Sequence, residues 1–270
     1  MIHVLGASGF IGREIAKTTN HREDICFYSS KPDFCEQTKF NFFSLTDKES
    51  WKNISLREED RIIFLCWKNL PNYQKAFHIT ENLPDSLAFF KFLSEKQIKK
   101  IVIAGTCYEY GIQNGELYEE MPTKPVNNYA IAKDSLRALS KALFESSGIE
   151  YAWLRIFYPY GEGQNSNSLI PTLKRAIEKG DEYFDTSQGD QIRDFIHISD
   201  VAKAFIKVID SKTARGLINV GSSNPVSIRD FLESYIESTG STIKLRLGAY
   251  PRKPDEPLAF WANCNKLIGI

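Results

Sequence analysis

Residues 3–16 read HVLGASGFIGREIA, a short apolar run that leads into glycines at positions 6, 9 and 12 and then into a helical pattern. Glycine permits a tight turn between a strand and a helix, and it lets backbone N–H groups approach a pyrophosphate at the helix amino terminus. The spacing GxxGxxG alone is a weak signal, and a glycine-bearing turn without a ligand is the alternative. Its place at the first strand-to-helix turn favours a dinucleotide site. We expect that site to include Gly6, Gly9, Phe10, Ile11, Gly12 and Arg13.

The chain continues this alternation of short apolar runs and longer helical stretches. Apolar runs of this length are typical of strands in a parallel sheet that is covered on both faces. The sequence therefore predicts an α/β protein with a Rossmann-type, doubly wound parallel sheet. Strands are expected at IHVLG (2–6), DICFYS (24–29), RIIFLC (61–66), KKIVIAG (99–105), YAWLRIFY (151–158) and GLINVG (216–221), and helices from Phe10 and over 73–96, 128–146 and 201–209.

Two segments differ from the rest of the chain in composition and in the pattern of their predicted elements. Residues 159–191 and 224–270 are richer in Gly, Pro, Ser and Asn, and their short elements do not keep the strand–helix rhythm. We interpret them as a smaller, discontinuous substrate-binding lobe over the strand ends. The cofactor-binding Rossmann domain then comprises residues 1–158 and 192–223.

Composition narrows the function classes. The 270 residues are 42% hydrophobic and 25% charged, as in ordinary globular proteins, which argues against disorder. Lys and Arg number 34, and so do Asp and Glu, so no net positive charge attracts a nucleic-acid backbone. Nucleic acid is therefore not expected as a partner, and an anionic ligand must be held by local groups.

The cysteines and the apolar runs bear on the compartment. Cys26, Cys35, Cys66, Cys107 and Cys264 are odd in number and include no CxxC pair, so neither a disulfide framework nor a metal site is indicated. The first strand-like run begins at Ile2, which leaves no room for a signal segment, and no apolar stretch reaches the roughly 18 to 20 residues of a spanning helix. We expect a soluble, cytoplasmic protein without a membrane partner.

The end of the second predicted strand bears on the cofactor. An acidic residue there usually binds the adenosine ribose of NAD, but this chain has Ser29, Ser30 and Lys31. Hydroxyls and an ammonium suit the 2′-phosphate of NADP, and Arg13 can add a second positive contact. The alternative is that Lys31 and Arg13 are solvated surface charges. The pattern favours NADP, with NAD as the alternative.

A tyrosine and a lysine stand four residues apart in NNYAIAKDSLR. Tyr129 and Lys133 share one face of a helix, where an ammonium can stabilise a phenolate and make the phenol an acid or base near neutral pH. About one such pair is expected by chance in this chain, so context decides. The context is IVIAGTCYEYG, where a predicted buried strand is followed by Thr106. Open α/β sheets bind ligands at this carboxyl end of their strands.

With this loop, threonine and Tyr-x-x-x-Lys pair, nearly the whole chain resembles the extended short-chain dehydrogenase/reductase family, also described as NAD-dependent epimerases and dehydratases. The resemblance implies that Thr106 binds the substrate oxygen, that Tyr129 is the acid/base, and that Lys133 assists it and holds the nicotinamide ribose. Asn82, in FHITENLPDSL, matches the helix asparagine of that family, although an ordinary surface asparagine is the alternative. The resemblance also implies a homodimer packed through the helices over 73–96 and 128–146.

The substrate lobe is similar to that of enzymes acting on nucleotide sugars. LRIFYPYGEGQ and IRDFIHISDVAKAF carry this likeness, and Arg193 and Arg252 are candidates for the substrate diphosphate because guanidinium groups suit phosphate oxygens. Ordinary salt-bridge arginines are the alternative. Cys107 and Tyr108 stand where 4,6-dehydratases have Asp and Glu, which excludes that elimination, and Tyr158 stands where many relatives have asparagine. These positions complete the predicted substrate site: Thr106, Cys107, Tyr108, Tyr158, Arg193 and Arg252.

The segments GTCYEYG and RIFYPYG most resemble those of bacterial reductases of nucleotide-linked 4-keto-6-deoxysugars, such as CDP-abequose synthases and dTDP-fucose-forming reductases. The leading hypothesis is thus an NADPH-dependent reductase of a C4 keto group, in the biosynthesis of surface-polysaccharide sugars such as those of O-antigen lipopolysaccharide. A C4 epimerase with retained NAD is the alternative, and the missing acidic residue after the second strand argues against it. A third hypothesis is a non-catalytic, dinucleotide-binding regulator. The presence of Thr106, Tyr129 and Lys133 argues against it, because a regulator without turnover does not need an acid/base set.

Overall fold

A computed structural model describes residues 1–31, 40–251 and 256–270. Within these residues, seven strands form one sheet in the order β12-β7-β5-β4-β1-β2-β3, and each strand runs parallel to its neighbours. This confirms the predicted doubly wound α/β fold. The strands are β1 (Ile2–Leu5), β2 (Ile25–Ser29), β3 (Phe40–Phe42), β4 (Arg61–Phe64), β5 (Lys100–Thr106), β7 (Glu150–Ile156) and β12 (Gly216–Val220).

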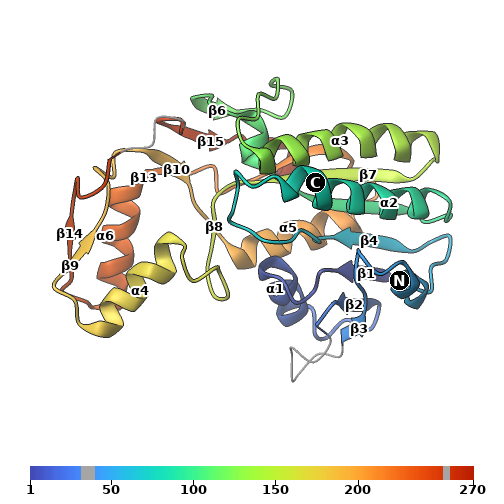
Figure 1. Cartoon of the computed structure of the whole chain (residues 1–270), viewed down its shortest axis with the longest axis horizontal. Coiled ribbons are helices and arrows are strands. Elements are labelled where there is room, and N and C mark those ends of the chain that lie inside the picture. Colours follow the sequence, from blue (N-terminus) through green and yellow to red (C-terminus); the bar gives the residue numbers. More distant parts are fainter. Residues whose placement is uncertain (32–39, 252–255) are drawn as a thin grey trace.

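Helices cover both faces of the sheet (Figure 1). Side chains alternate between the faces along each strand, so Ile101 and Ile103 of β5 join one hydrophobic core, while Val102 and Ala104 join the other. α1 and α5 pack against each other on one side, and α2 and α3 on the opposite side. The helices are α1 (Phe10–Thr18), α2 (Leu83–Ser94), α3 (Asn128–Ser146) and α5 (Ile198–Asp210), with shorter turns η2 (Lys48–Asn53), η3 (His78–Asn82), η4 (Cys107–Tyr110) and α7 (Asn265–Ile268).

The strand order places the ligand-binding edge. From β1 the chain moves outward through β2 to β3, and then returns to β4 on the other side of β1. At such a reversal, the loops after neighbouring strands diverge and leave a crevice at the carboxyl ends of the strands. The phosphate loop after β1 and the segments after β4 and β5 meet at that edge.

Several small elements lie away from the large sheet, and Figure 1 shows α4, α6, β9 and β14 at one end of the molecule. Ile170 and Leu173 of α4 share a small hydrophobic core with Leu232 and Ile236 of α6. The predicted division into 159–191 plus 224–270 stays a prediction, but β10 pairs with β13 across it. The elements are β6 (Gly115–Leu117), β8 (Pro159–Tyr160), α4 (Leu169–Lys179), β9 (Tyr183–Asp185), β10 (Ile192–Asp194), β11 (Ile196–His197), β13 (Pro225–Ser227), α6 (Ile228–Thr239), β14 (Lys244–Arg246) and β15 (Phe260–Ala262).

One predicted helix begins later than expected. The pattern over 73–96 becomes η3 followed by α2, so helical structure begins at His78. The carbonyl of Tyr73 accepts the backbone N–H of Tyr129 at 2.9 Å. That bond attaches residues 69–77 as a loop to the start of α3, next to the predicted acid/base.

The structure contains no helix, among the residues that it describes, that is long and apolar enough to cross a membrane.

Candidate active site

The phosphate loop has the geometry of an anion-binding turn. Gly6 has φ +90°, and a Cβ on Gly12 would lie 2.5 Å from the carbonyl oxygen of Gly6, so both positions require glycine. Helix α1 follows with Gly9 as its N-cap, and no side chain caps its first N–H groups. Those N–H groups and the helix dipole are suited to a pyrophosphate.

A cavity of about 580 Å³ connects this loop to the predicted catalytic residues. Its walls include Gly6, Gly9, Phe10, Ile11, Gly12 and Arg13 on one side and Thr106, Cys107, Tyr108, Tyr129, Lys133 and Tyr158 on the other. Residues that are about 100 positions apart in the sequence are thus brought to one cleft, because β1 and β5 end at the same edge of the sheet.

The predicted 2′-phosphate residues lie at the end of β2. Ser29 is buried, and its hydroxyl donates to the Ser8 hydroxyl at 2.6 Å and accepts the Lys31 N–H at 2.9 Å. Ser30 and Lys31 are exposed. Arg13 extends from α1 to the Gly163 carbonyl, 3.5 Å away. Ser29 therefore shapes the phosphate loop, while Ser30 and Lys31 present their side chains to solvent.

Thr106 ends β5 and begins η4. Its hydroxyl accepts the backbone N–H of Tyr108 at 3.3 Å, and it also contacts the phenol of Tyr129. The structure thus brings together the two residues predicted to share the reacting oxygen.

Tyr129 lies in the first turn of α3 and is buried among aromatic rings. Asn127 caps this helix by accepting the Ala130 N–H at 2.8 Å, which fixes the turn. The ring centroids of Trp67, Tyr73 and His78 lie 5.9, 5.5 and 5.4 Å from that of Tyr129. Burial raises the pKa of Tyr129 above its ordinary value, so the phenol is held in its protonated form.

Lys133 is one turn further along α3. Its ammonium donates to the Ala104 carbonyl at 3.0 Å and lies 4.1 Å from the centroid of the Trp67 ring. Burial lowers the pKa of Lys133 to about 7, although the charges of Glu109 and Cys66 oppose this. The pKa of Tyr129 is thus raised and not lowered as expected, because burial has the larger effect.

Asn82 is buried but does not line the cavity. Its amide accepts the Lys68 N–H and donates to the Lys68 carbonyl, both at 3.2 Å, and it lies 3.3 Å from Nδ1 of His78. The surface alternative for Asn82 is therefore wrong. In this structure Asn82 connects the segment after β4 to η3 and contacts His78, one of the residues that surround Tyr129.

Arg193 lies outside the cavity wall. It is only 1% exposed, and its guanidinium donates to the Tyr158 hydroxyl at 3.1 Å and pairs with Glu256 at 3.5 Å. Tyr158, which does line the cavity, separates Arg193 from it. A role for Arg193 at a substrate diphosphate stays a prediction, and Arg252 lies outside the described residues.

Sequence reasoning missed Trp67, Tyr73 and His78, the aromatic surround of Tyr129. They occur in the segment after β4, which borders the reversal in strand order. An aromatic-rich segment at that edge is a usable signal, because it lies where open α/β sheets bind ligands.

Comparison with known proteins identifies relatives over the whole chain. Residues 2–221 match the family described as "NAD dependent epimerase/dehydratase family". The dTDP-6-deoxy-L-talose 4-dehydrogenase (NAD(+)) of Aggregatibacter actinomycetemcomitans is 27% identical over 96% of this chain and 98% of its own length. The dTDP-4-dehydro-6-deoxyglucose reductase of Escherichia coli is 25% identical over 86% of this chain and 79% of its own. Among solved structures, UDP-N-acetylglucosamine 4-epimerase from Methanobrevibacter ruminantium M1, in complex with UDP-N-acetylmuramic acid, superposes with a TM-score of 0.84. It is 25% identical and covers 99% of this chain and 90% of its own.

Proposed function

The chain belongs to the NAD dependent epimerase/dehydratase family, and from that premise we propose that it reduces the C4 keto group of a nucleotide-linked 4-keto-6-deoxyhexose with NADPH. One observation carries the proposal. Among the described residues that line the cavity there is no carboxylate and no imidazole, and we assign proton transfer to Thr106, Tyr129 and Lys133. Elimination of water needs an additional acid or base, whereas reduction of a ketone needs one proton donor beside a hydride donor.

The loop residues fit a nicotinamide dinucleotide. Gly6 and Gly12 let the loop and the start of α1 pack closely, since a Cβ at either position would meet backbone atoms, and no side chain caps the first N–H groups of α1. We assign these N–H groups to the pyrophosphate and Lys133, which lines the same cavity, to the nicotinamide ribose. When bound, the cofactor supplies the hydride that reduces the carbonyl carbon.

Proton transfer falls to Tyr129. The phenol is protonated at neutral pH because burial raises its pKa, which suits it to donate to an oxyanion. We assign the Thr106 hydroxyl, which lines the same cavity, to orient that oxygen. Lys133 stabilises the phenolate that remains, and a proton from Lys133 can restore the phenol. The surrounding aromatic rings exclude water and strengthen these polar interactions.

We propose NADP and not NAD as the cofactor because of the residues at the end of β2. Ser30 and Lys31 are exposed where a carboxylate would repel a 2′-phosphate. The name of the Aggregatibacter relative specifies NAD(+), so NAD is the alternative cofactor.

The 6-deoxy sugar is supported by two relatives and by the cavity wall. The Aggregatibacter and Escherichia coli relatives carry 6-deoxy sugars in their names. Tyr108 and Tyr158 meet edge to face with centroids 6.0 Å apart, and Tyr73 and Tyr108 do so at 5.2 Å. This apolar wall suits a methyl group better than it suits a carboxylate.

A C4 epimerase is the second candidate, since the Methanobrevibacter structure is a 4-epimerase. The test is to supply CDP-, dTDP- and GDP-linked 4-keto-6-deoxysugars with NADPH and to follow the nicotinamide absorbance. A reductase consumes one NADPH for each sugar. Interconversion of hydroxyl epimers without added cofactor would overturn the reductase proposal and leave the roles of Tyr129 and Lys133 intact.

We also propose a homodimer through α2 and α3. Ile131 and Leu139, both on α3, are exposed at 38% and 50%. Apolar side chains exposed along one helix support a subunit contact there, and the share of α2 in that contact rests on the family resemblance. Light scattering of the purified protein tests this, and a monomer at micromolar concentration would contradict it.

A further inference from the structure

We infer that Glu109 is a positioning residue, whose buried carboxylate fixes Thr106 relative to the face of α3 that carries Tyr129 and Lys133. The inference rests on the proposed function, because it concerns the same reaction. Glu109 follows Thr106 by three residues, and its side chain is fully buried.

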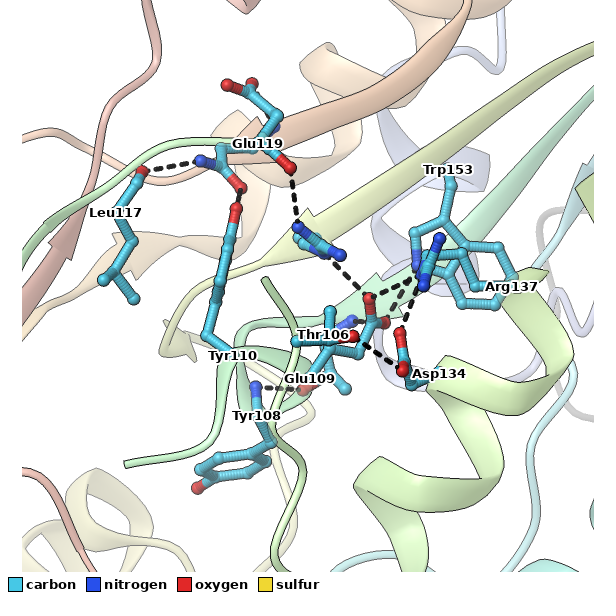
Figure 2. A network of polar contacts seen from close by, with 12 residues as sticks. Thr106, Tyr108, Glu109, Tyr110, Leu117, Glu119, Asp134, Arg137 and Trp153 are labelled. Atoms are coloured by element: carbon cyan, nitrogen blue, oxygen red, sulfur yellow. Dashed lines mark hydrogen bonds and ion pairs between the residues drawn. The ribbon is translucent and has the colours of Figure 1, made fainter. Parts of the chain in front are cut away.

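Three hydrogen-bond donors and a second guanidinium converge on this carboxylate, as Figure 2 shows. Oε1 accepts the backbone N–H of Thr106 at 3.0 Å and the Trp153 indole N–H at 2.9 Å. Oε2 accepts Nε of Arg155 at 2.8 Å and lies 3.9 Å from Nε of Arg137. The donors come from β5, β7 and α3, so one side chain connects three elements of the site.

The bonds at Thr106 are reciprocal. Glu109 accepts the Thr106 N–H, and in return the Thr106 hydroxyl faces the backbone N–H of Glu109, so that the two residues form a capping box at the start of η4. The Thr106 hydroxyl also accepts the N–H of Tyr108 at 3.3 Å. Thr106 is therefore fixed through its backbone and through its hydroxyl. Freeing the backbone of Thr106 would loosen the hydroxyl that is to orient the substrate oxygen.

The bond to α3 reaches the catalytic face of that helix. Tyr129, Lys133 and Arg137 follow one another at intervals of four and therefore share one face. Arg137 is held by Asp134 at 2.8 Å, besides its contact with Glu109. The catalytic face is thus attached by charge to the end of β5.

Stability alone is a poor explanation for this arrangement. A buried ion pair is often no more stabilising than apolar residues of similar volume, because both charges lose their hydration. The site is also closely packed, since a Cβ on Gly105 would lie 2.1 Å from Nε1 of Trp153, the indole that donates to Glu109. Such a cluster is suited to hold neighbouring groups at fixed distances.

The charge of Glu109 also acts on the proton-transfer groups. It raises the pKa of Lys133 in opposition to burial, and it adds to the rise that burial causes in the pKa of Tyr129. Both effects favour the protonated forms that a reduction uses. Among the described residues, the other titratable or charged groups around these side chains include Cys66, Tyr73, His78, Cys107, Tyr108, Asp134, Arg137, Tyr151 and Arg155.

The test compares Glu109→Gln with Glu119→Gln in the full-length protein. Glu119 is a second buried carboxylate of the network in Figure 2, but its side chain accepts the N–H of Asn219 and does not contact Thr106 or α3. We expect Glu109→Gln to lower kcat by roughly 10-fold to 100-fold with little change in KM, because misplaced catalytic groups cost about this much. The alkaline limb of the kcat profile should move to lower pH, since loss of the negative charge lowers the pKa values of Lys133 and Tyr129.

Glu119→Gln should leave the pH profile unchanged. A Glu109→Gln enzyme with the wild-type profile, or with the same profile and kcat as Glu119→Gln, would overturn the inference. If Glu109→Gln does not fold, Arg137→Gln replaces it, since Arg137 is on the helix side of the same contact. That variant should lower kcat without moving the alkaline limb to lower pH, and wild-type kcat would overturn the inference.

A second measurement separates this inference from the proposed function. NADPH fluorescence gives the pH dependence of cofactor binding without any sugar, and Lys133 lines the cofactor cavity. Glu109→Gln should shift that dependence to lower pH even if the wild-type enzyme reduces none of the sugars supplied. Failure of sugar reduction with the shift intact contradicts the proposed function alone, whereas an unshifted curve contradicts the inference about Glu109.

Discussion

Asp60 and Glu109 are both buried carboxylates, but they lie at opposite edges of the same sheet. Asp60 precedes β4 and accepts the amino group of Met1 at 2.7 Å and the Arg57 N–H at 2.8 Å, with Nε2 of His3 at 3.2 Å. Glu109 follows β5 and accepts the donors shown in Figure 2. The chemistry of the two clusters is similar. The two clusters differ in position: Glu109 lies at the carboxyl ends of the strands, which border the cavity, whereas Asp60 lies at the amino ends, which do not.

We infer from these two clusters that the position of a buried ion pair in the fold decides whether it has a functional role. At the amino edge, burial opposes ionisation of Asp60, yet bonds from the amino terminus, Arg57 and His3 lower its pKa. That cluster contributes to stability. At the carboxyl edge, the cluster also fixes Thr106 and the face of α3, so changes there should alter catalysis before they alter folding.

The largest effect is expected for Tyr129→Phe at the carboxyl edge. Removing the transferable proton should lower kcat by about 100-fold to 10,000-fold and leave NADPH affinity unchanged. Steady-state kinetics and a fluorescence titration measure both. Tyr151→Phe is the matched control, because Tyr151 is a buried tyrosine of β7 outside the cavity wall. Wild-type turnover by Tyr129→Phe would remove this residue from the mechanism.

Lys133→Met should separate catalysis from stability at the same edge. Burial lowers the pKa of Lys133 to about 7, so holding its charge destabilises the folded state fully below pH 7 and progressively less as the pH rises towards 10. The variant should lose activity, yet melt at least about 3 °C higher at pH 7 without ligands, with the gain shrinking towards pH 10. A folded variant that melts below wild type at pH 7 would contradict this.

Asp60→Asn should show the opposite behaviour. Breaking this buried cluster should cost about 3 kcal/mol of unfolding free energy, while kcat/KM stays within about twofold of wild type. Because the pKa of Asp60 is lowered in the folded protein, its contribution is present above about pH 4 and is lost as the pH falls further. Urea denaturation at pH 7 and pH 3 measures the difference. A large loss of activity in the folded variant would erase the contrast between the two edges.

The smallest effect concerns an exposed charge that belongs to neither buried cluster. Lys31→Ala should weaken NADPH binding by roughly tenfold and leave NADH binding unchanged, since only NADPH carries the 2′-phosphate. Lys52→Ala, an exposed lysine paired with Glu49, is the control. Equal loss for both cofactors would show that Lys31 does not select NADP.

The sequence predicted regular and local features well. Helix α3 has the predicted bounds, because its apolar spacing and its packing agree, and Thr106, Tyr129 and Lys133 meet in one cavity as expected. Predictions that depended on tertiary contacts were less complete. Nothing in CYEYG indicates that Glu109 is buried, since its partners Arg137, Trp153 and Arg155 lie 28 to 46 residues away. The loop before His78 depends on a bond to Tyr129. The position of Arg193 likewise depends on a tertiary contact, its bond to the Tyr158 hydroxyl, which the sequence did not indicate.

The most direct measurement uses NADPH deuterated at C4 of the nicotinamide, on each face in turn, with a dTDP-linked 4-keto-6-deoxyhexose. We expect one of the two labelled cofactors to transfer one deuterium to C4 of the sugar for each NADPH consumed, as read by NMR. A product without deuterium at C4 from either cofactor would contradict it, because a hydride from a retained NAD would then be the source.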